Sequence, residues 1–140
     1  MENTVNIYIK TRYQEADMQG VIHNSVYLIY YDEVRMAYID KYIPEYDEEI
    51  ARLMVHTISN KYIKPIYPRE EIKLSISLKL QTSVRSQFEI NIYNEEGALV
   101  HTAIQDMVWT DSKGNLINIQ KEIPALYQKL KDLEVNCDNE

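Results

Sequence analysis

The chain has 140 residues, of which 45% are hydrophobic and 26% are charged, a balance typical of one soluble globular domain. Its 22 acidic residues outnumber its 15 basic residues, and the formal net charge of −7 argues against a general nucleic-acid-binding surface. No apolar run approaches the ~20 residues of a membrane-spanning helix, and the N-terminus lacks the apolar core of a signal peptide. We therefore expect a cytoplasmic protein with no membrane partner.

Cysteine and histidine usage excludes two further classes of site. Cys137 is the single cysteine, so no disulfide can form within the chain, and it lies in the polar segment 136–140, which we expect to be disordered. Three scattered histidines give no metal-ligand spacing, and we expect His56 and His101 to be structural. The sequence predicts one domain over residues 1–135, with no metal site and no cofactor.

The first half of the chain predicts a strand, a loop and a long helix. Residues 4–12 alternate between apolar and polar side chains, as in a half-buried strand. A polar loop over residues 14–20 follows, and residues 25–42 predict a helix that ends before Pro44. This helix is apolar on most sides, so we expect a sheet or a partner subunit to cover most of it. The acidic residues 45–53 are compatible with a short second helix.

The second half predicts strands. Residues 55–67 form the first, with Pro65 and Pro68 marking its end or a sheet edge. Residues 72–81 and 88–92 alternate strictly, residues 94–97 predict a hairpin turn, and residues 99–110 predict a central strand. Pro124 suits the first turn of a short C-terminal helix. This order predicts an α+β fold in which a long helix packs on one mostly antiparallel sheet.

An acid just before the long helix is the clearest functional signal. Asp17 precedes the helix start, and Gly20 between them permits a tight bend. This arrangement can bring a carboxylate close to the unpaired amides at a helix N-terminus. Carbonyl chemistry uses both groups, because the acid activates or attacks and the amides hold the developing negative charge. A loop acid that only caps the following turn is the competing interpretation.

The same segment resembles a known family. Asp17 and Gly20, then Asn24, Tyr27 and Leu28, match the signature of hotdog-fold thioesterases of the 4-hydroxybenzoyl-CoA thioesterase type. Residues 62–71 are similar to the family's Tyr-x-x-Pro strand turn, although the usual Gly-Asp is replaced by Arg-Glu-Glu, and residues 85–88 match its next strand. The resemblance spans residues 5–124. It implies an antiparallel sheet of about five strands wrapped around a central helix, and a homodimer or homotetramer with sites between subunits.

The resemblance also implies catalytic roles. Asp17 would act as general base or as nucleophile, and the sequence does not choose between them. The main-chain N–H of Asn24 would polarise the thioester carbonyl. The roles of His23 follow from its place at the helix start and not from the resemblance, since similar proteins often have Asn or Tyr there: it would contact the substrate, assist a proton transfer or only cap the helix.

Further residues are predicted to bind an acyl-CoA substrate. Gly20 would allow close approach of the backbone to the thioester, and Tyr27 would line the acyl pocket. Lys64, Arg69 and Arg85 would hold the phosphates of CoA, with Ser86 close to the pantetheine arm. The apolar helix favours an apolar or aromatic acyl group.

Three functions stay open at this point. The first is a thioesterase acting on an acyl-CoA, or alternatively on an acyl carrier protein thioester. The second is a hotdog hydratase or dehydratase in which His23 and Asp17 form an acid–base pair. The third is a non-catalytic module that binds acyl thioesters.

Overall fold

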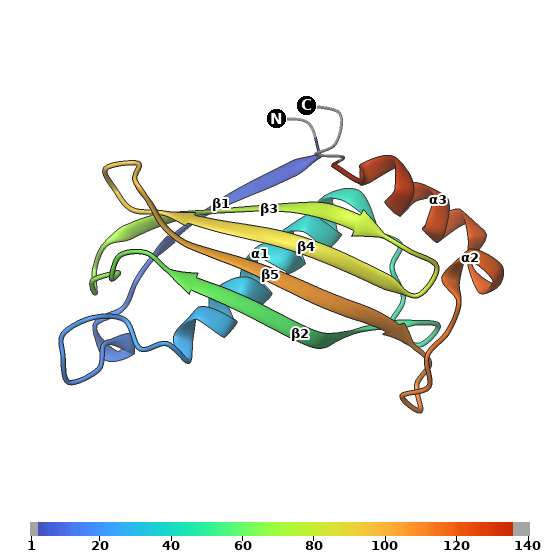
Figure 1. Ribbon diagram of the computed structural model, residues 1–140, viewed down its shortest axis with the longest axis horizontal. Helices are drawn as coiled ribbons and strands as arrows, with labels where there is room; N and C mark the ends of the chain where they lie inside the picture. Colours follow the sequence, from blue (N-terminus) through green and yellow to red (C-terminus); the bar gives the residue numbers. More distant parts are fainter. Residues whose placement is uncertain (1–2, 136–140) are drawn as a thin grey trace.

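A five-stranded antiparallel sheet with the strand order β1–β3–β4–β5–β2 forms the body of the computed structural model, which describes residues 3–135. The long helix α1 lies against one face of this sheet, and two short helices lie beyond one end of it (Figure 1). The strands are β1 (Thr4–Lys10), β2 (Arg52–Tyr62), β3 (Glu71–Gln81), β4 (Arg85–Tyr93) and β5 (Leu99–Thr110), and the helices are the 3₁₀ turn η1 (Tyr13–Glu15), α1 (Val26–Tyr42), α2 (Ile119–Glu122) and α3 (Pro124–Leu133).

The core lies between α1 and the face of the sheet that it covers. Alternate residues of β3 and β4 are buried, in the register that the period-2 pattern predicts. The helix contributes mostly tyrosines to this core, including Tyr30, Tyr31 and Tyr38. The predicted α+β fold with one long helix on an antiparallel sheet is thereby confirmed.

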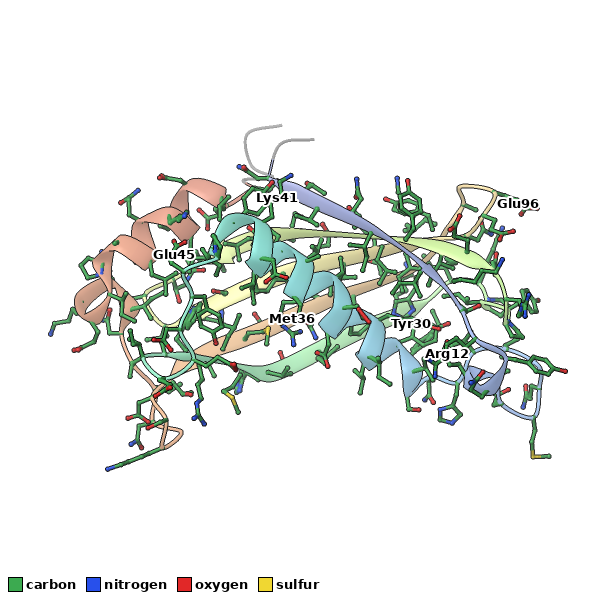
Figure 2. The ribbon with its side chains drawn as sticks, turned by 180° about the vertical axis from the view of Figure 1, so that it is seen from behind. Arg12, Tyr30, Met36, Lys41, Glu45 and Glu96 are labelled. Carbon is green, nitrogen blue, oxygen red and sulfur yellow. The ribbon has the colours of Figure 1, made fainter. Side chains whose placement is uncertain are left out.

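Two apolar strips of the chain are not covered. Leu28, Ile29 and Met36 lie on the side of α1 that faces away from the sheet, and Met36 is 52% exposed. Figure 2 looks onto the molecule from the side of α1 and labels Met36. The edge strand β2 is exposed along most of its length, and its Val55 is 47% exposed. The helix is therefore less covered within one chain than its composition predicted.

Several elements differ from the sequence predictions, and β2 already begins at Arg52, before the predicted residue 55. Strand β2 ends at Tyr62, before the predicted limit, because the N–H groups of both Ile63 and Lys64 donate to the carbonyl of Val100 and the regular ladder stops. Residues 45–51 form turns without a helix, since Asp47 accepts the N–H of Glu49 in a local side-chain turn. The extra helix α2 begins where Asn118 accepts the N–H of Lys121.

The two ends of the described chain lie side by side (Figure 1). The side-chain amide of Asn3 donates to the carbonyl of Asp132, and the N–H of Val135 donates to the carbonyl of Leu78 on β3. Both contacts lie near the start of β1. The loop that connects β1 to α1 lies at the opposite end of this strand, away from the chain ends. The prediction for residues 136–140, with Cys137, lies outside the described residues. No helix within residues 3–135 is long and apolar enough to cross a membrane.

Candidate active site

The loop between β1 and α1 folds back on itself as a small hairpin. Ala16 and Ile22 form an antiparallel bridge, and the N–H of Gly20 donates to the carbonyl of Asp17 at 3.0 Å. Gly20 has a φ of 80°, which residues with a side chain rarely adopt, so the turn requires glycine. The N–H of Ile22 donates to the carbonyl of Ile66 at 2.8 Å and fixes the hairpin to the segment after β2.

Glu15 holds this hairpin against the helix. Its Oε1 accepts the hydroxyl of Tyr30 at 2.8 Å and the N–H of Arg12 at 2.9 Å, and its carbonyl accepts the N–H of His23 at 3.0 Å. Burial, together with the hydrogen bond to Glu15, raises the pKa of Tyr30, so its hydroxyl stays a donor. Figure 2 labels Arg12 and Tyr30, which lie near each other at this end of α1. Glu15 could not be recognised from the sequence, because no local spacing connects it to Tyr30.

A pocket of about 490 Å³ opens between the hairpin, the start of α1 and the end of β2. It brings together the predicted residues Asp17, His23, Asn24, Tyr27 and Lys64. Its other lining residues are Val21, Ile22, Tyr62, Ile63 and Pro65. Gly20 shapes the hairpin but does not line the pocket.

Asp17 has one occupied and one available oxygen. Its Oδ1 accepts the N–H of Gln19 at 2.8 Å, which is the turn-capping role of the competing interpretation. Its Oδ2 makes no hydrogen bond to any part of the chain between residues 3 and 135. The half-buried carboxylate can therefore cap the turn and still act on a ligand in the pocket.

The start of α1 supplies hydrogen-bond donors on the same side. Ser25 precedes the helix, its side chain makes no capping hydrogen bond, and the first turn contains no acid. The main-chain N–H of Asn24 has no hydrogen-bond acceptor among the described residues. Because the positive end of the helix dipole is not neutralised here, this position favours negative charge on a ligand. The His23 ring lies beside this helix start, with its Nδ1 within 3.0 Å of both the N and the Oγ of Ser25.

Aromatic rings form the inner wall of the pocket. The ring centroid of Tyr27 lies 4.6 Å from that of His101 and 5.2 Å from that of Tyr62. His101 is fully buried, and its Nε2 is hydrogen-bonded to the hydroxyl of Tyr31, which also bonds to Asn60. Burial lowers the pKa of His101 to about 4, so this ring is neutral at pH 7. His101 does not line the pocket, and its buried Nδ1 has no hydrogen-bond partner among the described residues.

Comparison with known proteins identifies the family. The sequence model of the thioesterase-like superfamily matches residues 11–131, nearly the whole described chain. The chain belongs to the thioesterase-like superfamily. No protein of curated function matches the sequence.

Several solved structures share this fold. A DHNA-CoA thioesterase from Staphylococcus aureus superimposes with a TM-score of 0.86 at 22% identity, over 93% of this chain and 90% of that one. A hypothetical protein from Thermus thermophilus gives 0.82 at 20% identity, over 95% and 99%. Another Staphylococcus aureus protein, solved in complex with CoA, gives 0.78 at 10% identity, over 95% and 87%. At these identities the likeness shows the fold, and the predicted hotdog fold is confirmed.

In this thioesterase-like chain, two predicted substrate-binding residues lie far from the pocket. Arg85 and Ser86 open β4, whereas the pocket lies near the other end of that strand. The Nε of Arg85 lies 3.5 Å from a carboxylate oxygen of Asp106 on β5. Ser86 is fully buried and accepts a hydrogen bond from the indole of Trp109. Within one chain neither residue can touch a ligand beside Asp17, so their predicted roles would require a partner subunit.

The cations predicted for CoA are also separated from one another. Arg69 does not line the pocket, and its backbone, with a φ of 68°, donates to the carbonyl of Thr11 at the start of the hairpin. Lys64 lines both the pocket and a neighbouring hollow of about 380 Å³. That hollow also contains Glu70, Glu95 and Glu96, the last of which Figure 2 labels at the turn after β4. A phosphate bound in that hollow would be repelled by three carboxylates. Lys64 is therefore a candidate phosphate ligand only where it faces the pocket.

Proposed function

We propose that this protein hydrolyses an acyl thioester to a free acid and a thiol, with Asp17 as the catalytic carboxylate. One observation carries the proposal. A carboxylate oxygen without a hydrogen-bond partner lines the same pocket as Asn24, whose main-chain N–H is also unpaired, at the start of α1. The superfamily membership gives this arrangement its chemical context.

Two reaction courses fit the arrangement. As general base, Asp17 would take a proton from water, and the resulting hydroxide would attack the thioester carbonyl and expel the thiolate. As nucleophile, Asp17 would attack the carbonyl itself, form a mixed anhydride and release the thiolate, after which water would cleave the anhydride. In both courses negative charge develops on the carbonyl oxygen, where the Asn24 N–H and the helix dipole would stabilise it.

We propose CoA as the thiol that carries the acyl group. A relative of the same fold was solved with CoA bound, and Lys64 supplies a cation at the pocket. An acyl carrier protein remains the alternative. A carrier protein that is itself acidic would meet Glu70, Glu95 and Glu96 beside the pocket, which would weaken its approach.

We further propose that two copies pair along β2 and that the site is completed between them. The edge strand and the outer side of α1 carry the exposed apolar residues Val55, Leu28 and Met36, which a second copy would bury. Antiparallel pairing of two β2 strands would place the start of the partner's β4 beside this chain's pocket. The partner's Arg85 could then reach the substrate, as the resemblance implied.

The alternative of a hydratase receives no geometric support. That chemistry would need an acid–base pair of Asp17 and His23, yet no hydrogen bond joins them, and the His23 ring is bonded to Ser25. Hydration of crotonyl-CoA measured in the same assays would reveal such an activity directly.

The deciding experiment measures thiol release from a panel of acyl-CoAs, from acetyl to palmitoyl and including benzoyl and phenylacetyl. Asp17→Asn is the informative variant, because the amide oxygen can still accept the N–H of Gln19 and preserve the turn. We expect kcat to fall by about 10²-fold or more, since the variant can neither remove a proton nor attack efficiently.

A matched control is Asp40→Asn, which changes an exposed acid on α1 and should leave turnover unchanged. Thermal unfolding of each variant separates lost chemistry from lost folding. Turnover of Asp17→Asn near the wild-type level would show that Asp17 is not the catalytic acid. Tight binding of an acyl-CoA without turnover by the wild type would favour the binding module.

A further inference from the structure

The side chain of His23 is held by the residue two positions along the chain. The main-chain N–H of Ser25 donates to Nδ1 of His23 at 3.0 Å, and the Oγ of Ser25 lies 2.8 Å from the same nitrogen. A peptide N–H can only donate, so Nδ1 must offer its lone pair to it. The neutral ring therefore carries its proton on Nε2.

The other ring nitrogen faces no protein acceptor. Nε2 of His23 makes no hydrogen bond to the chain between residues 3 and 135, and the ring lines the pocket together with Asp17 and Asn24. The tautomer thus presents an N–H donor in the pocket where the thioester is proposed to lie. This donor is independent of the main-chain N–H of Asn24.

We propose that His23 is a catalytic hydrogen-bond donor, which binds the thioester through Nε2–H, and that Ser25 is the positioning residue that fixes its tautomer. The proposal rests on the proposed thioesterase function. His23 transfers no proton in this role; it stabilises negative charge that develops on the substrate, as a neutral imidazole can do. Asp17 keeps the roles of base or nucleophile.

The geometry opposes a role for His23 as base. A base acting through Nε2 would need its proton on Nδ1, and that proton would point at the N–H of Ser25. Two donors facing each other at this distance repel, and the peptide N–H would lose its acceptor. A shared proton relay with Asp17 is equally unsupported, because no hydrogen bond joins the two side chains.

Two substitutions separate a donor from a base. His23→Gln places an amide N–H near the position of Nε2, whereas His23→Asn ends near the position of Nδ1. Neither amide can act as a base. We expect His23→Gln to retain most of the wild-type kcat and His23→Asn to lower kcat by about 10²-fold, the usual cost of one lost donor. The KM should change little in both, since the interaction strengthens in the transition state.

Either of two results would overturn the role of donor. Equal inactivity of both variants would indicate proton transfer, and wild-type kcat in both would show that His23 does not touch the reacting group. Lys113→Gln, a change at an exposed residue of the turn after β5, should leave kcat unchanged.

The tautomer can be read without any activity. Long-range ¹H–¹⁵N spectra of the ¹⁵N-labelled protein at neutral pH distinguish a protonated from an unprotonated ring nitrogen, and His23→Gln assigns the His23 signals. We expect the proton on Nε2 in the wild type and also in Ser25→Ala, which keeps the main-chain donor. A proton on Nδ1 in either protein would overturn the assignment. This readout holds even if no thioester is turned over, so it separates failure of this inference from failure of the proposed function.

Discussion

Asp17 and Glu15 are two carboxylates of the same loop with opposite surroundings. Glu15 accepts hydrogen bonds from Tyr30 and Arg12 and fixes the loop to α1. Asp17 uses one oxygen within its own turn and leaves the other available. Glu15 therefore has a structural role in the loop, whereas Asp17 keeps one carboxylate oxygen free to interact with a ligand.

His101 gives the stability of the protein a defined dependence on pH. Its folded pKa of about 4 is below its value of 6.5 in an unfolded chain, because burial opposes the charged ring. As the pH falls from 6.5 towards 4, the unfolded chain binds a proton that the folded protein does not. The stabilising contribution is present above pH 6.5 and is lost on acidification, by a free energy on the order of 3 kcal/mol.

Urea unfolding at pH 7 and pH 5 measures this effect. We expect the loss of free energy of unfolding between these pH values to be smaller in His101→Gln than in the wild type. Ser112→Ala, a change in an exposed turn that removes no titratable group, provides the control and should retain the full loss. An equal loss in His101→Gln and wild type would show that His101 is not the group responsible.

At this scale the sequence could identify Asp17, His23 and Asn24, because they are neighbours in one motif. It could not identify Glu15, and it placed Tyr62 in a family motif without predicting its contact with Tyr27. The Tyr30–Glu15 hydrogen bond and the ring contact between Tyr27 and Tyr62 join residues far apart in the chain, and they exist only after α1 has packed on the sheet.

At the scale of elements, periodicity predicted the strands well wherever one face is buried. Strands β3 and β4 follow their alternating patterns closely, and β5, predicted as a central strand, lies between β4 and β2. The predictions were wrong where hydrogen bonding decides a boundary, at the end of β2 and in the turns of residues 45–51. The turn at Asp47 depends on a side-chain hydrogen bond, and β2 ends where two N–H groups share the carbonyl of Val100. Neither interaction produces a hydrophobic pattern in the sequence.

A buried hydrogen-bond chain joins three strands at the end of the sheet away from the pocket. The indole N–H of Trp109 on β5 donates to Oγ of Ser86 on β4 at 3.0 Å, and that hydroxyl donates to Gln81 on β3 at 2.5 Å. We expect Ser86→Ala to lower the free energy of unfolding by about 1–3 kcal/mol, because the buried indole N–H loses its acceptor.

Chemical denaturation of Ser86→Ala measures this cost, and Ser112→Ala, at an exposed turn, is the control that should be neutral. Measuring kcat and KM of Ser86→Ala also tests the substrate-binding role that the sequence predicted for Ser86. An unchanged free energy of unfolding combined with a raised KM would mean that Ser86 serves the ligand and not the sheet.

For the whole molecule, a single chain leaves apolar surface uncovered on the exposed side of α1 and along the edge strand β2. The sequence placed too much apolar surface on the helix for one sheet to cover, and the structure leaves part of it exposed. Arg69 and Arg85, which the sequence predicted to hold the phosphates of CoA, also lie outside the pocket. One chain does not bring these groups together, and local sequence patterns cannot show what a second chain adds.

The proposed pairing along β2 predicts a linked loss of assembly and activity. Val55→Glu places a charge on the exposed edge strand, and we expect it to shift the protein to the monomer and to lower turnover with it. Light scattering after size exclusion gives the mass, and thiol release gives the activity.

Leu116→Glu introduces the same charge at another exposed apolar residue, in the segment after β5, and should change neither quantity. If Val55→Glu kept the wild-type mass, the interface would lie elsewhere. A monomer with full turnover would instead show that one chain forms the complete site.

The contact between the start of β1 and the end of α3 has a consequence for how the chain can be rearranged. Because Asn3 touches Asp132, a short linker could join the two ends without strain, and the chain could be reopened in the exposed turn at residues 111–114. Such a circular permutant would keep the hairpin, α1 and the end of β2 in their present order, and with them every residue that lines the pocket. The geometry of the site would then not depend on the order in which the other strands and helices are synthesised.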